Sequence, residues 1–133
     1  MATEQRKPHV LVVDDDIELA LTYEELLHAH GYQASTAANG NEALKLVLNG
    51  GIDAIICDLR MPELSGDLFY QEVGRVRPEL LKRFIFFTAN ADNPLYESFL
   101  KSLAVPIISK PATVGRVLEK LASVLANPAP AAA

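Results

Sequence analysis

Short apolar runs alternate with longer segments of helical period along almost the whole chain, and this alternation limits the possible folds more than any other feature of the sequence. Five runs are predicted to be strands, over residues 9–13, 32–37, 52–57, 84–88 and 105–109. Three of these runs are apolar nearly throughout, as strands covered on both faces are. Alternation of this kind is typical of an α/β domain with one parallel sheet and helices on each side of it.

Helix signals fill the intervals between the predicted strands. Five helices are predicted, over about residues 16–30, 40–49, 66–76, 93–103 and 113–125. Asp16 is a suitable N-cap for the first helix, and Gly31 ends it. Pro78 disfavours a helical conformation in the residue before it and therefore ends the third helix. Asp92 or Asn93 caps the fourth helix, with Pro94 at its first position.

Composition excludes several classes of protein. The chain has 133 residues, 50% of them hydrophobic, which is enough for one domain with a buried core. Its formal net charge of -5 and its lack of clustered Lys and Arg argue against direct nucleic-acid binding. A single cysteine, Cys57, excludes an internal disulfide. No apolar run approaches the roughly 20 residues of a membrane span, and the first residues do not resemble a signal peptide. We therefore expect a cytoplasmic protein with one domain over residues 9–126, an extension over 1–8 and a disordered Pro/Ala tail over 127–133.

Polar residues that could bind a ligand or take part in a reaction lie at the carboxyl ends of the predicted strands. They are Asp14, Asp15 and Asp16 after the first strand, Asp58 after the third, Thr88 at the end of the fourth and Lys110 after the fifth. In a parallel sheet these ends share one edge, where α/β domains bind ligands. We therefore expect these side chains to lie together.

Carboxylates that converge on one edge repel one another unless a cation neutralises them. Oxygen ligands without a nearby histidine suit Mg²⁺, which keeps several waters and takes one or two carboxylates together with phosphate oxygens. Lys110 comes from a different strand and would pair with a phosphoryl group, while the Thr88 hydroxyl would donate a hydrogen bond to it. Asp58, alone at its strand end, is the natural nucleophile for phosphoryl transfer.

Four motifs in this order resemble one known family. "LVVDDD" follows the first strand, "IICDLRMPELSG" surrounds the third, "FFTAN" lies at the fourth and "IISKPA" at the fifth. Together they closely resemble the receiver domain of bacterial response regulators, over nearly the whole chain. The resemblance implies a flavodoxin-like, doubly wound sheet of five strands in the order 2-1-3-4-5, with five helices. It also implies a phosphoacceptor protein of two-component or phosphorelay signalling, which is not a classical enzyme.

The resemblance implies a role for each of these acids. Asp58 would take a phosphoryl group from a phosphohistidine on a histidine kinase or a histidine phosphotransfer protein. Asp14 and Asp15 would form the acid pair that holds Mg²⁺, Asp15 directly and Asp14 through water. The backbone carbonyl of Arg60 would be a further ligand of the metal. Asp16 lies outside this set and is assigned to the helix cap.

The other matching positions would bind the phosphoryl group. Thr88 and the backbone amide of Ala89 would hold its oxygens, and Lys110 would pair with them, oriented by a bond to Pro111 that is usually cis in the family. Ile107 departs from the family, because many members carry an aromatic residue there. The approach to the fifth strand resembles that of receivers attached to hybrid sensor kinases.

Two other functions are compatible with part of the pattern. A phosphatase of the haloacid dehalogenase type would use Asp14 as its nucleophile and Asp16 as its general acid, but Glu18 stands where that family has a small residue. A degenerate receiver would serve only as an interaction module, and the presence of Asp58, Thr88 and Lys110 argues against it. Output is predicted to pass through protein–protein contacts of the fourth helix, fifth strand and fifth helix, or through phosphate relay.

Overall fold

The computed structural model describes residues 6–126 and contains one parallel sheet of five strands in the order β2-β1-β3-β4-β5. The strands are β1 (His9–Val13), β2 (Gln33–Ala37), β3 (Ala54–Cys57), β4 (Phe84–Thr88) and β5 (Ile107–Ser109). All five predicted strands are present, and the order is the one that the resemblance implied. The prediction of a tail over residues 127–133 lies outside the described residues.

Strands β1 and β4 have the predicted bounds, whereas β2, β3 and β5 begin later than predicted. At β5 the reason is Pro106, which has no N–H to donate to the ladder. Its carbonyl still accepts a hydrogen bond from Phe86 N at 3.0 Å, so the chain is already in register with β4 at this residue.

Four of the predicted helices form as α1 (Ile17–Ala29), α2 (Gly40–Asn49), α3 (Gly66–Val76) and α5 (Val114–Leu125). Asp16 caps α1 by accepting a hydrogen bond from Leu19 N at 3.2 Å. Thr113 caps α5 in the same way, through Arg116 N at 3.2 Å. These two side chains satisfy amide groups that have no partner inside the helix.

The fourth helix is shorter than predicted, and one helical segment was not predicted. Asn93 is the cap and accepts from Leu95 N, but the segment begins as the 3-10 helix η2 (Pro94–Tyr96) and continues as α4 (Glu97–Lys101). The Ser102 hydroxyl donates to the Phe99 carbonyl at 2.6 Å, and this bond competes with a further helical turn. A 3-10 helix η1 (Pro78–Arg83), for which no element was predicted, buries Leu80.

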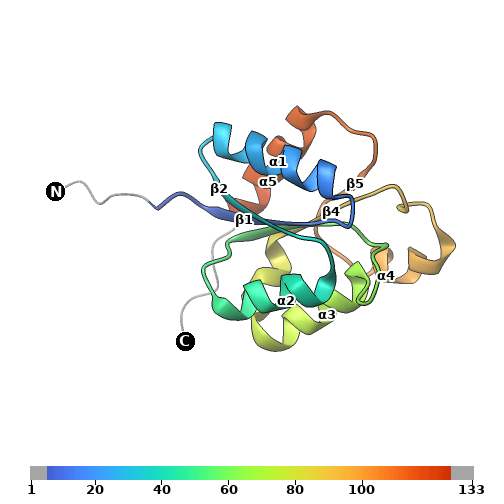
Figure 1. Cartoon of the computed structure of the whole chain (residues 1–133). Coiled ribbons are helices and arrows are strands. Elements are labelled where there is room, and N and C mark those ends of the chain that lie inside the picture. Colours follow the sequence, from blue (N-terminus) through green and yellow to red (C-terminus); the bar gives the residue numbers. More distant parts are fainter. Residues whose placement is uncertain (1–5, 127–133) are drawn as a thin grey trace.

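Helices cover both faces of the sheet and bury two separate cores. In Figure 1, α1 and α5 lie above the sheet, and α2 and α3 lie below it. The upper core joins α1 and α5 to strand residues such as Val12 and Ile108, and the lower core joins α2, α3 and α4 to residues such as Leu11 and Phe86. Side chains of successive strand residues therefore point to opposite layers.

Within residues 6–126, no helix has both the length and the hydropathy to cross a membrane. The sheet and its two helix layers leave the carboxyl ends of β1, β3, β4 and β5 on one edge, and this edge carries the polar residues singled out from the sequence.

Candidate functional site

Backbone hydrogen bonds continue past the strand ends and fix the residues that carry the polar side chains. Asp58 N donates to Val13 O at 3.0 Å, and Asp14 N donates to Ala37 O at 3.0 Å. Lys110 N donates to Thr88 O at 2.9 Å. Asp14, Asp58 and Lys110 are therefore each held by the strand beside them, and the sheet itself sets their spacing.

The Lys110 ammonium joins two carboxylates that come from different strands. Lys110 Nζ lies 2.6 Å from Asp14 Oδ2 and 3.3 Å from Asp58 Oδ2. Both carboxylates are buried, with residue exposures of 4% for Asp14 and 8% for Asp58. Two acids at these exposures need a neutralising partner, and the ammonium group provides one. The same ammonium lies 5.3 Å from the centre of the Phe87 ring, a cation–π contact that the sequence did not reveal.

Burial and mutual contact shift the pKa of both Asp14 and Lys110. Burial raises the pKa of Asp14 even though its hydrogen bonds to Lys110 and to the Asp16 amide act in the opposite direction. Burial lowers the pKa of Lys110, but the hydrogen bond to Asp14 and the charges of Asp58 and Asp14 outweigh it, so the net pKa is raised. Lys110 is therefore a charged ammonium at neutral pH.

The second oxygen of each buried carboxylate is held by a backbone amide. Asp58 Oδ1 accepts from Leu59 N at 2.7 Å, and Asp14 Oδ1 accepts from Asp16 N at 2.9 Å. One oxygen of each acid thus faces the backbone and the other faces Lys110. Because the Lys110 bond to Asp58 is the longer of the two, Asp58 Oδ2 is the less firmly bound oxygen at the site.

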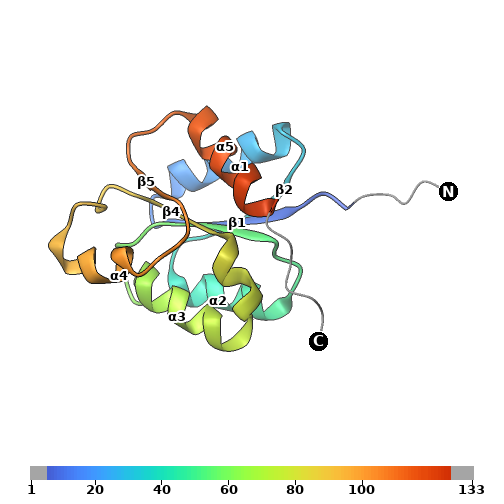
Figure 2. The same ribbon diagram turned by 180° about the vertical axis from the view of Figure 1, so that it is seen from behind.

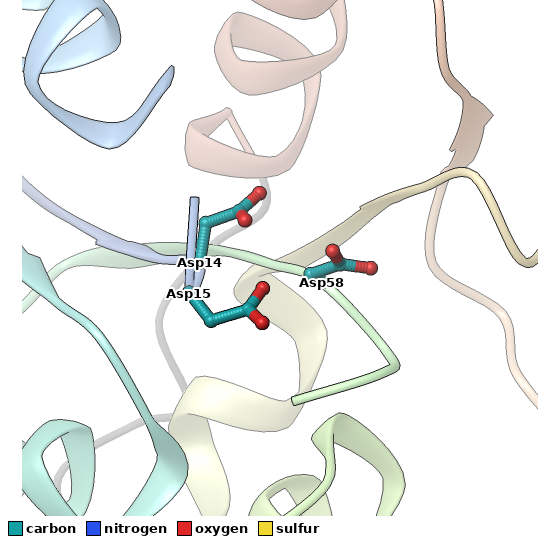
Figure 3. Close-up of side chains that lie close together, drawn as sticks. All are labelled: Asp14, Asp15 and Asp58. Carbon is teal, nitrogen blue, oxygen red and sulfur yellow. The ribbon is translucent and has the colours of Figure 1, made fainter. Parts of the chain in front are cut away.

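Asp15 completes a group of three carboxylates. Asp14, Asp15 and Asp58 each offer an oxygen within 4.8 Å of the others, and Asp15 is exposed. Figure 3 shows that Asp14 and Asp15 come from the turn after β1 and that Asp58 lies opposite them. Three oxygen ligands with one side open to solvent fit Mg²⁺, which retains several of its waters. The residues therefore suit the metal that the sequence indicated.

Thr88 is fully buried at the end of β4, and its hydroxyl has a defined partner. Asn90 N donates to Thr88 Oγ1 at 3.0 Å. This bond uses a lone pair of the hydroxyl and leaves its proton free to be donated. Ala89 and Arg60, whose backbone groups were predicted to bind the phosphoryl group and the metal, are both exposed at the same edge.

Asp16 does not belong to the carboxylate group. Its side chain caps α1 and its amide supports Asp14, as described above. The prediction that the acidic run divides into a cluster of ligands and a helix cap is therefore confirmed for the cap.

Gly66 lets the start of α3 pack against the backbone next to Asp58, a role that was not predicted from the sequence. Its N–H donates to Leu59 O at 2.7 Å, and a Cβ built at this position would overlap the Asp58 carbonyl oxygen. The start of α3 therefore lies against the backbone of the loop that carries Asp58. The "LSG" sequence just before the third helix was the available signal, since a glycine at a helix start often marks a close approach of two backbones.

The family model of the response regulator receiver domain matches residues 10–122. The transcriptional regulatory protein ZraR of Salmonella typhimurium is 31% identical over 121 residues, which cover 91% of this chain and 27% of ZraR. A response regulator receiver protein of Anaeromyxobacter sp. is 32% identical over 109 residues, 82% of this chain and 45% of that protein. The chain spans less than half the length of these curated relatives.

Solved structures share the fold. The response regulator TrrA of Thermotoga maritima, in complex with Mg²⁺ and BeF, superposes with a TM-score of 0.75 at 30% identity, over 88% of this chain and 98% of that chain. The chemotaxis protein CheY4 of Vibrio cholerae superposes with a TM-score of 0.78 at 28% identity, over 90% of this chain and 99% of that chain. With a family model that matches most of its length and the same fold as these structures, the chain belongs to the response regulator receiver domain family.

Proposed function

We propose that the protein accepts a phosphoryl group on Asp58 from a phosphohistidine, with Mg²⁺ bound beside it, and that this modification switches its contacts with another protein. The observation that carries the proposal is the meeting of Asp14, Asp15, Asp58 and Lys110 at one edge of the sheet. Acids and an ammonium in this arrangement match the charge distribution of phosphoryl transfer, which depends mainly on positioning and electrostatic stabilisation.

Asp58 Oδ2 is the proposed attacking atom. Its partner Oδ1 is held by Leu59 N at 2.7 Å, which orients the carboxylate, while Oδ2 has only the 3.3 Å contact with Lys110. A bond forms between Oδ2 and phosphorus, and the bond between phosphorus and the imidazole nitrogen of the donor breaks. The electron pair of that bond leaves with the imidazole.

The remaining groups would stabilise the transferred phosphoryl group. Lys110 Nζ already contacts Asp58 Oδ2 and would form an ion pair with the phosphoryl oxygens after the transfer. The Thr88 hydroxyl has a proton to donate because Asn90 N binds its oxygen. The backbone amide of Ala89, an exposed residue, would donate to a further oxygen. Mg²⁺, held by Asp14, Asp15, Asp58 and the carbonyl of Arg60, would neutralise charge on the phosphoryl oxygens when bound.

The geometry favours Asp58 over Asp14 as the nucleophile. Both oxygens of Asp14 have short partners, Asp16 N at 2.9 Å and Lys110 Nζ at 2.6 Å. In the haloacid dehalogenase reading, Asp16 would be a general acid, but its carboxylate caps α1. Each residue that the alternative needs is thus engaged elsewhere.

The proposal extends to partners and location. A histidine kinase or a histidine phosphotransfer protein would supply the phosphoryl group, and α4, β5 and α5 would carry the response to an output protein. A cytoplasmic location fits the free, buried Cys57, since a reducing compartment keeps thiols unpaired.

Labelling with acetyl phosphate tests this function. The wild-type protein should take up a phosphoryl group only with Mg²⁺, and Asp58→Asn should abolish uptake. Asp92→Asn, which removes an exposed acid outside the site, is the matched control and should label normally. Labelling that persists in Asp58→Asn, or that ignores chelation of Mg²⁺, would contradict the proposal.

A further inference from the structure

The aromatic ring of Phe87 lies beside the ammonium group that joins the two buried carboxylates. Lys110 Nζ is 5.3 Å from the centre of this ring, in addition to its contacts with Asp14 Oδ2 at 2.6 Å and Asp58 Oδ2 at 3.3 Å. The face of an aromatic ring attracts a cation, and the attraction is stronger where water is excluded. The Lys110 side chain is 19% exposed and Phe87 is buried, so little water separates the two groups. Phe87 is therefore a third electrostatic partner of Lys110.

The Phe87 ring is held in place by the upper core. Figure 2 shows α1 and α5 together over the face of the sheet to which this core belongs. The ring meets that of Tyr23 on α1 in a T-shaped contact, with the ring centres 5.5 Å apart and the ring planes at 68°. Aromatic pairs prefer this arrangement to a face-to-face one. Because both residues are buried, the Phe87 ring has little freedom to turn, and it forms a fixed surface beside Lys110.

The backbone brings the ring and the lysine together. Phe87 is paired with Ile108 in the register of β4 and β5, and Lys110 N donates to Thr88 O at 2.9 Å. The Lys110 side chain therefore starts next to the end of β4 and extends toward the carboxylates that follow β3 and β1. A lysine side chain held in one extended conformation loses rotamer freedom. Contact with a fixed ring favours that one conformation over the others.

The three partners of Lys110 differ in what the proposed reaction does to them. Asp58 becomes an aspartyl phosphate, and Asp14 is a proposed ligand of Mg²⁺, so both carboxylates change their contacts. Of the three contacts, the one with the Phe87 ring is the one that the reaction leaves unaltered. We propose that Phe87 is a positioning residue for phosphoryl transfer, whose ring holds the Lys110 ammonium beside Asp58 while the carboxylates exchange partners. This inference rests on the function proposed above for Asp58.

A simpler interpretation is that Phe87 only fills space in the upper core. Replacing it with a smaller residue cannot separate the two roles, because the core would lose packing at the same time. Fluorine atoms on the ring do separate them. Each fluorine withdraws electron density from the face of the ring and so weakens its attraction for a cation, while the size of the ring changes little. A ring that only fills space tolerates this change, whereas a ring that positions the ammonium loses its effect step by step.

Variants with one, two or three fluorines on the Phe87 ring test the proposal. The logarithm of the labelling rate at saturating acetyl phosphate and Mg²⁺ should fall with each fluorine, and the trifluoro ring should lower the rate about threefold. Phe87→cyclohexylalanine keeps an apolar ring without an aromatic face and should lower the rate about tenfold. The same fluorinated series at Phe86, whose ring packs in the lower core, is the control and should label as the wild type does. A rate that is constant across the Phe87 series, or that falls equally in the Phe86 series, would overturn the proposal.

A second measurement separates this inference from the role of Asp58. NMR of the Lys110 ammonium group, in the unphosphorylated protein without Mg²⁺, measures how fast its hydrogens exchange with water. The trifluoro ring at position 87 should speed this exchange about threefold, because the ammonium is then held less firmly. Absence of labelling in the wild type would refute the function proposed for Asp58. Normal labelling of the wild type, together with ammonium exchange that does not respond to fluorine, would refute the role of Phe87 alone.

Discussion

Replacing Gly66 with alanine tests how closely the start of α3 must approach the loop that carries Asp58. The added Cβ would overlap the Asp58 carbonyl oxygen and would lie 2.9 Å from Leu59 Cα. Both obstacles are backbone atoms, so no side-chain rotation relieves the overlap. The helix or the loop must move, and the 2.7 Å hydrogen bond from Gly66 N to Leu59 O must lengthen.

The cost can be worked out from these contacts. Overpacking a closely packed site costs about 1–3 kcal/mol, and a weakened hydrogen bond adds up to about 1 kcal/mol. The higher helix propensity of alanine offsets at most about 1 kcal/mol of this destabilisation. We therefore expect Gly66→Ala to lower the free energy of unfolding by about 2 kcal/mol. With a denaturant slope of about 2 kcal/mol per molar, the urea midpoint falls by about 1 M.

Gly115 provides the control, because it lies inside α5 and a Cβ there would meet no atom within 4 Å. Gly115→Ala should raise the free energy of unfolding by about 0.5–1 kcal/mol. Urea unfolding followed by circular dichroism measures both variants. Gly66→Ala should also label more slowly with acetyl phosphate, since its strain falls on the backbone of Asp58. A Gly66→Ala midpoint at or above the wild-type value would refute the reasoning.

Three further predictions follow from the site. Asp16→Ala removes the α1 cap and should lower the free energy of unfolding in urea by about 1 kcal/mol, with Mg²⁺ affinity nearly unchanged. Asp15→Ala should weaken Mg²⁺ binding, measured by calorimetry, with little loss of stability. The reverse pattern would contradict the division of the acidic run into metal ligands and a helix cap. Lys110→Met leaves the buried Asp14 and Asp58 without their ammonium partner and should lower the free energy of unfolding by about 1–3 kcal/mol, part of which added Mg²⁺ restores. A variant as stable as the wild type without Mg²⁺ would count against a stabilising role of the contact between Lys110 and the two acids. Cys57 is fully buried, and burial raises the pKa of its thiol well above its usual value. A disulfide reagent should therefore modify Cys57 only after unfolding. Rapid reaction of the native protein would contradict this prediction and would show that β3 opens.

The sequence predicted the architecture well because its strongest signals are local. The apolar runs of β1 and β4 match the strand bounds of the structure, since β4 is buried along its length and β1 at every residue but His9. The site could be located because parallel strands bring their carboxyl ends to one edge, which requires no knowledge of side-chain geometry. Asp14, Asp58, Thr88 and Lys110 do lie at that edge.

Features that depend on contacts between distant elements could not be predicted in the same way. The Lys110 bond to Asp14 joins residues 96 positions apart, and the sequence suggested only a phosphoryl partner for this lysine. The fourth helical segment is bounded by Asn93, which caps η2 at its start, and by the bond from Ser102 to Phe99 at the end of α4, and the apolar period alone indicates neither.

We propose above that Asp58 is the residue that accepts the phosphoryl group, and its modification can be located directly. Reduction of the acyl phosphate with borohydride after incubation with Mg²⁺ and acetyl phosphate converts the modified aspartate to homoserine, which peptide mass mapping locates. We expect homoserine at position 58 and unmodified aspartate at positions 14 and 15. Homoserine at position 14, with Asp58 unchanged, would contradict it.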